Sequence, residues 1–208
     1  MGLLAFAAYV FCATPAPYPL DSAELATAAF GLGVAHPPGE ETTLLLGKLF
    51  TFLPLGSVAF KVALSQAASG ALAAVLVYLL VLEVAGRMAV IVTGTGEGTR
   101  VLVAAAAALA FAFAPGVIIV SARPEVYATQ TALSLGALLL ALRAGLAAEP
   151  RLALLAAMVI GFGVGNHSLI AGLVGLGAVA GAWPLLRRST ADDVGAVNRA
   201  PTAAGATR

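Results

Sequence analysis

Charge is scarce in this sequence of 208 residues: 10% of the residues are charged, whereas 61% are hydrophobic. Soluble domains average about a quarter charged, and so few charges cannot cover the surface of a soluble fold of this size, which excludes a soluble enzyme. The net charge of +1 excludes the dense basic face that nucleic-acid binding requires. A single cysteine, Cys12, excludes an internal disulfide. The composition therefore predicts an all-α, polytopic protein embedded in a lipid bilayer.

Long apolar runs account for most of the chain. A membrane span needs about 20 mostly apolar residues, and we expect complete spans at 58–84, 101–121 (kinked at Pro115), 126–143, 151–165 and 168–186. The last two are joined by a tight turn near Gly165-Asn166-His167. The run 1–13 is too short to span alone and is expected to be part of an incomplete first span. The sequence thus predicts about six spans, with an external loop at 14–57 and a disordered polar tail at 187–208.

Basic residues set the expected orientation, because Lys and Arg favour the cytoplasmic side of a membrane. With the loop 14–57 outside, the outer segments hold only Lys48, Lys61 and Arg123. The inner segments then hold Arg87, Arg100, Arg143, Arg151, Arg187 and Arg188. The reactive side chains fall on the other side of the membrane. Those outer residues are Asp21, Glu24, Glu40, Glu41, Glu125, His36 and His167.

The segment 21–39 is the richest in polar side chains. Asp21 and Ser22, with Glu24 behind them, are typical of a helix start, where acids cap the backbone and favour the helix dipole. Asp21 and Glu24 are three residues apart and would share one helix face. The pair could therefore be a cap, a general base with its partner, or part of a metal site. His36 ends the segment in a proline-rich turn, as a structural hydrogen-bonding residue or as a ligand. Residues 42–53 are predicted to form a short helix at the membrane interface.

Several motifs occur in order along the chain and carry a family resemblance. They are Asp21-Ser22, Glu24-Leu25, Leu32-Gly33, Ala35-His36-Pro37-Pro38-Gly39, Leu45-Leu46-Gly47-Lys48-Leu49-Phe50, Glu125-Val126-Tyr127 and Asn166-His167. Over about residues 1–186 the chain resembles the bacterial membrane proteins related to transmembrane protein 260, which are linked to protein O-mannosyltransferases. Two features depart from the family pattern: Glu40-Glu41 follows the His-Pro-Pro-Gly motif, and the family's proteins are much longer.

The resemblance implies a GT-C type glycosyltransferase module that moves a sugar, mannose, from a polyprenyl-phosphate donor to Ser or Thr of an exported protein. It implies Asp21 as catalytic base and Glu24 as its supporting acid. The implied location is the extracytoplasmic face of a bacterial inner membrane. Candidate substrate contacts are His36, Lys48, Glu125, Tyr127, Asn166 and His167, and charge and position add Arg123.

Other readings stay open at the level of sequence. Asn166 and His167 could instead pack across the bundle, and a divalent metal is neither required nor excluded. A non-catalytic membrane subunit or a truncated fragment is the main alternative function. A transporter is a weaker alternative, because transport sites place polar residues in mid-span, and the span centres here are almost purely Ala, Leu, Val and Gly.

Overall fold

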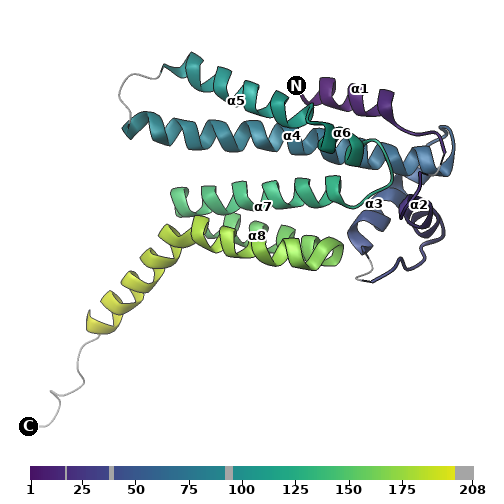
Figure 1. Ribbon diagram of the computed structural model, residues 1–208. Helices are drawn as coiled ribbons and strands as arrows, with labels where there is room; N and C mark the ends of the chain where they lie inside the picture. The colour runs from purple at the N-terminus through teal and green to yellow at the C-terminus, as the bar shows by residue number, and fades with distance from the viewer. Residues whose placement is uncertain (17, 38–39, 92–95, 200–208) are drawn as a thin grey trace, which may run out of the picture.

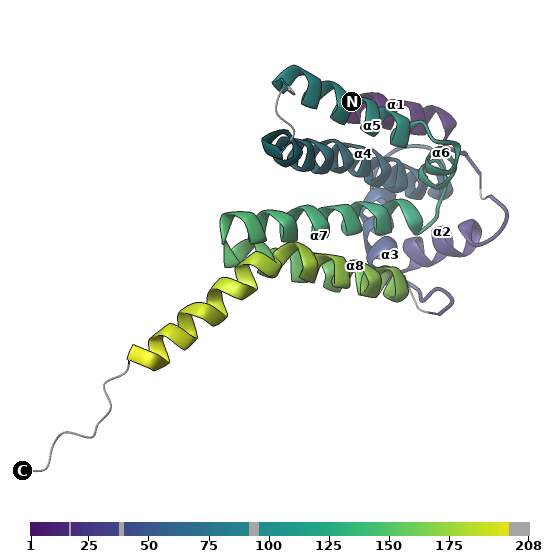
Figure 2. The same ribbon diagram turned by 60° about the vertical axis from the view of Figure 1, so that its left-hand side comes forward.

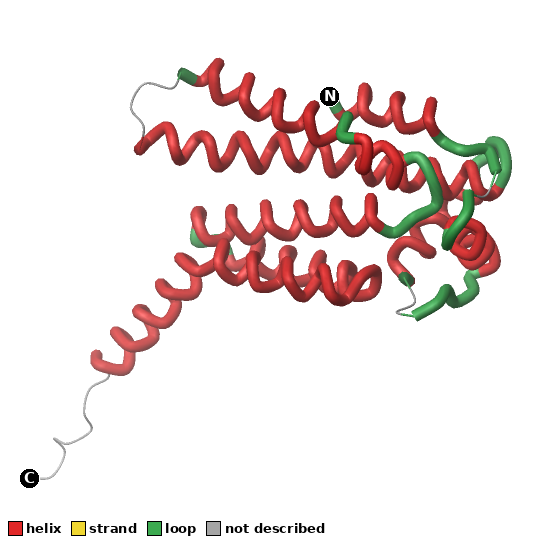
Figure 3. The backbone as a smooth tube through the Cα atoms, in the orientation of Figure 1, coloured by secondary structure: helices red, strands yellow, loops and turns green. Residues whose placement is uncertain are grey.

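The protein is a bundle of helices, as seen in a computed structural model that describes residues 1–16, 18–37, 40–91 and 96–199 (Figure 1). Within these residues every regular element is helical (Figure 3). The helices are α1 (Gly2–Cys12), α2 (Ser22–Gly31), α3 (Glu41–Thr51), α4 (Val58–Ile91), α5 (Glu97–Ala112), α6 (Pro115–Ser121), α7 (Tyr127–Ala147) and α8 (Pro150–Arg199). The expectation of an all-α fold is thereby met, with short helices α2 and α3 inside the loop 14–57.

Three described helices are long and apolar enough to cross a membrane: Val58–Arg87 in α4, Tyr127–Ala147 in α7, and Pro150–Leu185 in α8. Helices α5 and α6 make a fourth if they are counted as one span with a bend of 62°. Pro115 is the first residue of α6, where its missing N–H needs no helical partner. The predicted kink is therefore a complete break. By length and composition the described helices support three to four spans when α8 is counted once, and the expected count of six is not confirmed.

Helix α8 folds back on itself at His167, whose backbone leaves helical geometry (φ −155°, ψ 89°). A Cβ built on Gly163 would lie 3.3 Å from the Cβ of Ala171, and Ala156 and Ala178 belong to one buried cluster. In a straight helix these pairs would be about 12 Å and 33 Å apart. The two arms of α8 therefore run side by side against α7 (Figures 1 and 2).

The end of α8 corrects the expectation of a disordered tail from residue 187. The helix continues to Arg199, because extending an existing helix needs no new nucleation. Residues 200–208, the rest of that expected tail, lie outside the described residues.

Small residues let the helices pack closely. Gly145 of α7 faces Gly181 of α8, and a Cβ on Gly145 would collide with the Gly181 carbonyl oxygen. Alanines fill the contact between α1, α4 and α5, where the Tyr9 hydroxyl donates to the carbonyl oxygen of Ala112 at 2.8 Å. Such small-residue interfaces are typical of helices that associate within a membrane.

The two ends of the bundle differ in charge. Helices α2 and α3, the start of α7 and the reversal of α8 gather at one end, on the right in Figure 1. We call this the acidic end, because it holds Asp21, Glu24, Glu40, Glu41 and Glu125. The end of α4, the start of α5 and the end of α7 lie at the opposite end, with Arg87, Arg100 and Arg143. The charge segregation expected from the sequence thus runs along the bundle axis.

Candidate functional site

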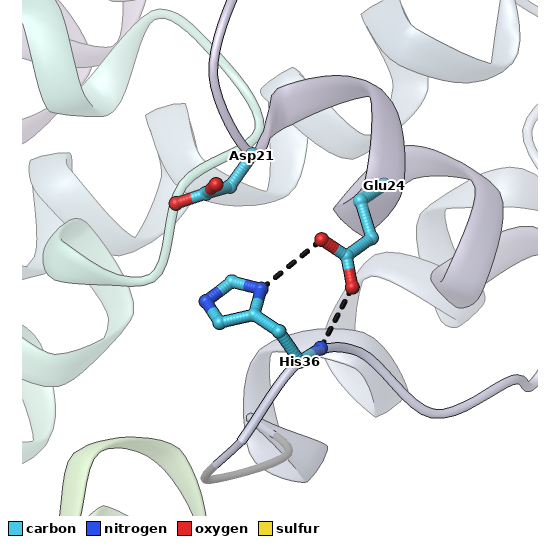
Figure 4. A group of neighbouring side chains, drawn as sticks. All are labelled: Asp21, Glu24 and His36. Carbon is cyan, nitrogen blue, oxygen red and sulfur yellow. Dashed lines mark hydrogen bonds and ion pairs between the residues drawn. The ribbon is translucent and has the colours of Figure 1, made fainter.

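Asp21, Glu24 and His36 come together at the start of α2 (Figure 4). Asp21 occupies the N-cap position of α2, yet its side chain makes no capping hydrogen bond. Glu24, in contrast, is held at both oxygens: the His36 backbone N–H donates to Oε1 at 2.7 Å, and His36 Nδ1 lies 3.1 Å from Oε2. The capping interpretation of Asp21 therefore lacks its hydrogen bond.

Local backbone geometry explains how the chain brings these residues together. The start of α2 is tied down by the buried Ser22 hydroxyl, which donates to the Pro124 carbonyl oxygen at 2.8 Å. Leu20, just before Asp21, and Leu32, just after α2, both adopt left-handed backbone angles (φ 72° and 51°). The left-handed turn at Leu32 ends the helix and sends residues 33–36 back along it. His36 is thereby returned to the first turn of α2.

A third carboxylate, Glu40, contacts His36 from the other side. The Glu40 side chain is buried, its Oε1 lies 3.7 Å from His36 Nε2, and its Oε2 has no hydrogen-bond partner among the described residues. The hydrogen bond that the His36 ring donates to Glu24, followed by the charge of Glu40, raises the pKa of His36. Burial raises the pKa of Glu40, although the His36 charge opposes that shift. The contacts with Glu24 and Glu40 favour the protonated form of His36.

Arg123 and Glu125 form a neighbouring pair in the segment before α7. Arg123 Nε lies 3.4 Å from Glu125 Oε1, and the guanidinium lies 4.6 Å from the centre of the Tyr18 ring. Glu125 is 5% exposed; burial raises its pKa, the Arg123 charge lowers it, and the Asp21 charge raises it further.

Two cavities flank this part of the molecule. One, of about 170 Å³, is mostly apolar and has Arg123 in its wall, together with Cys12, Thr14, Tyr18, Ile118, Ile119 and Ala122. The other, of about 560 Å³, follows α2 and contains Glu24. Its remaining lining residues are Ala23, Thr27, Ala28, Gly31, Gly33 and Val34.

Lys48 is not brought to the carboxylates. Its ammonium donates to the carbonyl oxygen of Phe30 at 2.6 Å and lies over the rings of Phe30 and Phe52. Phe30 is near the C-terminal end of α2, about 14 Å along the helix from Asp21. Lys48, which belongs to α3, therefore contacts the C-terminal end of α2 and packs it against α3.

Asn166 is completely buried and all of its hydrogen-bonding capacity is used. Its Oδ1 accepts from the N–H and the hydroxyl of Thr43, at 3.1 and 2.6 Å. Its Nδ2 donates to the carbonyl oxygen of Val126 at 3.2 Å and to Gln130 Oε1 at 3.1 Å. Asn166 thus joins α3, α7 and the reversal of α8, and it has no group left for a substrate.

Tyr127 and His167 lie next to this junction. Their ring centroids are 6.1 Å apart with an interplanar angle of 42°. Tyr127 is 46% exposed, and the buried Nδ1 of His167 has no hydrogen-bond partner among the described residues. The two rings form a separate aromatic contact rather than part of the Asp21 group.

Asp21, Glu24 and His36 are also suited to hold a cation. Each offers one ligand atom, and the three atoms lie within 4.8 Å of one another. Two carboxylates with one imidazole suit divalent ions such as Mn²⁺ or Zn²⁺. Binding would require a neutral His36, so it would compete with the protonated form favoured by Glu24 and Glu40.

Sequence reasoning missed the role of Glu40. It noted Glu40 as an extra negative charge after the His-Pro-Pro-Gly motif, of which Pro38 and Gly39 lie outside the described residues. The structure buries the Glu40 carboxylate against His36. A signal was present in the spacing, because His36 and Glu40 are four residues apart. Neither His36 nor Glu40 lies in a helix, however, so that spacing does not have its usual meaning here.

Fold and site together define a helical membrane protein with an exposed carboxylate-histidine group at one end of its bundle. Residues 21–188 match the family described as the protein O-mannosyl-transferase TMEM260 N-terminal domain, and the chain belongs to this family. The mouse protein O-mannosyl-transferase TMEM260 is 49% identical over 70 residues, which are 33% of this chain and 10% of the mouse protein. The match therefore spans about a tenth of the length of that curated relative. No solved structure matches the chain.

Proposed function

We propose that this chain carries the sugar-transfer site of a membrane O-mannosyltransferase of the GT-C type. The reaction moves mannose from a polyprenyl-phosphate donor to a Ser or Thr hydroxyl of an exported protein. The observation that carries the proposal is Asp21, an exposed carboxylate without a capping hydrogen bond, beside the Glu24–His36 pair. The mouse relative is named as a protein O-mannosyl-transferase, which supports the same chemistry.

Asp21 is the base in this proposal. A Ser or Thr hydroxyl is a poor nucleophile at neutral pH and needs a positioned acceptor for its proton. The hydroxyl oxygen attacks the anomeric carbon, its proton passes to Asp21, and the bond from that carbon to the phosphate oxygen breaks. The electron pair leaves with the lipid phosphate. Glu24 supports Asp21: since both of its oxygens contact His36, it contributes charge and position rather than proton transfer.

Arg123 is the cation proposed for the donor phosphate. It lies in the wall of the 170 Å³ cavity whose other residues include Ile118 and Ile119 of α6. An arginine beside an apolar cavity suits a phosphate attached to a hydrocarbon chain. Glu125 holds the guanidinium until the phosphate binds. Lys48, which the family resemblance also implied as a phosphate contact, is engaged elsewhere.

The groove of about 560 Å³ along α2 is the proposed acceptor site. Glu24, Thr27 and two glycines line it, so its walls combine polar groups with room for a peptide backbone. A peptide lying there would pass Glu24 and bring a Ser or Thr side chain towards Asp21. His36 holds Glu24, which lines this groove, through two contacts.

A divalent cation on Asp21, Glu24 and His36 is a second form of the same proposal. The cation would polarise the donor phosphate or the acceptor hydroxyl. Transfer in membranes stripped with EDTA and then titrated with Mn²⁺ distinguishes the two forms. Loss and recovery of transfer support the cation, whereas unchanged transfer supports the protonated His36.

We also propose that the acidic end faces the outside of a bacterial inner membrane. The arginines at the opposite end support this orientation, because basic loops stay in the cytoplasm. In a Cys12→Ser background, Thr27→Cys should react with an impermeant thiol reagent in intact cells and Thr99→Cys should not. Both positions are exposed in the structure. The reverse labelling pattern would overturn the orientation.

The test of the catalytic proposal is Asp21→Asn in the full-length gene product. Asparagine is nearly isosteric and remains a good N-cap, so this change removes only the basicity. Mannosyl transfer in membranes should fall about a hundred- to ten-thousandfold, with thermal stability unchanged. Near-normal turnover would leave Asp21 as a helix-start residue and favour a non-catalytic membrane subunit.

A further inference from the structure

Three arginines and one glutamate surround a cavity at the end of the bundle opposite Asp21. The cavity has a volume of about 370 Å³ and is lined by residues of α4, α5 and α7. Arg87 and Glu83 come from α4, Arg100 from α5 and Arg143 from α7. Pockets for small ligands typically measure about 300–1,000 Å³, so the space is large enough for a headgroup. This cavity has no part in the transfer chemistry proposed above.

The positive charge in this cavity exceeds what the protein itself neutralises. Glu83 uses both carboxylate oxygens: Oε1 contacts Arg87 at 3.2 Å and Oε2 contacts Arg143 Nε at 3.3 Å. Arg100 Nε is buried and has no hydrogen-bond partner among the described residues. One glutamate against three arginines leaves two positive charges around the cavity. An anion with several oxygen acceptors would complete the missing interactions.

Gly86 makes room for the Arg100 side chain. A Cβ built on Gly86 would lie 3.4 Å from an Arg100 guanidinium nitrogen, which places that guanidinium directly against the α4 backbone. Arg100 is therefore held at the wall of the cavity by packing between α4 and α5. The Arg87 and Arg143 side chains, in contrast, are 46% and 44% exposed. An anion can thus enter past two accessible arginines and meet a third that is already positioned.

The apolar residues that line the cavity indicate that the anion carries a hydrocarbon group. Leu79 and Leu82 line the cavity about one turn before Glu83 and Gly86, on the side of α4 that leads towards the middle of its span. Charged groups at the helix ends and leucines towards the span centre repeat the order of a phospholipid, with its phosphate at the interface and its acyl chains inside. A free phosphate would use the arginines but would gain nothing from the leucines.

We infer that this cavity binds the phosphate group of an anionic phospholipid from the adjacent leaflet. Arginine is suited to this contact, because its planar guanidinium donates two parallel hydrogen bonds to phosphate oxygens. The bound lipid would join α4, α5 and α7 at a cavity whose lining holds one acid, Glu83. The chemistry shared with inorganic phosphate is the anion contact, and the two sources differ in the hydrocarbon.

The experiment measures lipid binding to the full-length gene product purified in a neutral detergent. Thermal stability is titrated separately with phosphatidylglycerol, phosphatidylcholine and inorganic phosphate. We expect a saturable stabilisation with phosphatidylglycerol and a much weaker one with phosphatidylcholine. Arg100→Gln should weaken the apparent affinity for phosphatidylglycerol about tenfold. Arg151→Gln, which removes the same charge from an exposed residue outside the cavity, is the matched control and should leave this affinity unchanged.

A second variant guards against effects on folding. Glu83→Gln removes the only acid of the cavity, so it should tighten phosphatidylglycerol binding while Arg100→Gln weakens it. Weaker binding in both variants would overturn the assignment, because it would show a general loss of structure. Equal stabilisation by phosphatidylglycerol and phosphatidylcholine would also overturn it. Inorganic phosphate that stabilises the protein as well as phosphatidylglycerol does would replace the lipid by a free anion.

Discussion

Two groups of polar residues lie at the same end of the bundle, and they differ in how many of their hydrogen-bonding atoms have partners. At the junction of α3, α7 and α8, Asn166 is buried and makes four hydrogen bonds. At the start of α2, the exposed Asp21 carboxylate makes no capping bond, and the buried Oε2 of Glu40 has no partner among the described residues. Asn166 is saturated, whereas the second group retains unused acceptors.

Hydrogen-bond partners distinguish residues that stabilise the fold from residues that are available for chemistry, whereas the sequence motifs do not. Asn166-His167 and the segment Asp21–Glu24 both belong to motifs of the family resemblance. Both place polar side chains where a helix starts or reverses. A buried polar group must be paired, since an unpaired one costs about 1–3 kcal/mol. Saturation therefore indicates a role in folding. An exposed carboxylate such as that of Asp21, which has no hydrogen-bond partner among the described residues, costs the fold little.

The sharpest test of the saturated group is Asn166→Ala. Removal of this side chain would leave buried groups of Thr43, Val126 and Gln130 unpaired, so the free energy of unfolding should fall by about 2–4 kcal/mol. Thermal unfolding in detergent measures this effect, with Thr27→Ala, an exposed α2 hydroxyl, as the control. Normal stability together with lost transfer would move Asn166 into the substrate site.

Arg123→Gln tests whether the unsaturated region extends to the donor phosphate. Loss of one charge-assisted contact should raise the KM for the polyprenyl-phosphate donor about tenfold, with a smaller effect on kcat. Lys61→Gln is the matched control, since its ammonium donates to the Thr51 carbonyl oxygen outside this region. An unchanged donor KM in Arg123→Gln would remove Arg123 from the proposed donor site.

Lys48→Met tests whether Lys48 stabilises the fold or contacts the donor. The methionine keeps the apolar stem but loses the hydrogen bond to Phe30, so the free energy of unfolding should fall by about 1 kcal/mol. The donor KM should stay the same, because the ammonium lies at the far end of α2 from Asp21. Should the donor KM rise while stability is unchanged, Lys48 would return to the phosphate contacts implied by the family resemblance.

The smallest effect expected is a shift in the titration of His36. Its pKa is raised above the ordinary value of 6.5, chiefly by Glu24 and then by Glu40. The stabilising contact is therefore complete below pH 6.5 and is lost as the pH rises through the raised pKa of the folded state. Imidazole NMR signals should show the His36 pKa falling in Glu24→Gln and unchanged in Glu41→Gln. The same pKa in all three proteins would contradict the contact.

Several features were predictable from the sequence because their causes are local. Scarce charge and long apolar runs require membrane helices whatever the packing. Pro115 interrupts a helix through its own missing N–H, and the structure breaks there. Asp21 and Ser22 were expected at a helix start, and α2 begins at Ser22. The separation of acids from arginines also follows from the order of spans along the chain.

Tertiary structure alone decided which polar residues are free. Glu40 and Glu41 are adjacent acids, yet only Glu40 is buried against His36. Glu40 itself has a left-handed backbone conformation just before α3, and this conformation turns the Glu40 side chain inward. Lys48 was expected near Asp21, but helix packing carries its ammonium to the Phe30 carbonyl oxygen. Asn166 is saturated by partners at positions 43, 126 and 130. Burial and hydrogen-bond partners at such sequence separations depend on how helices pack, which no local pattern of residues encodes.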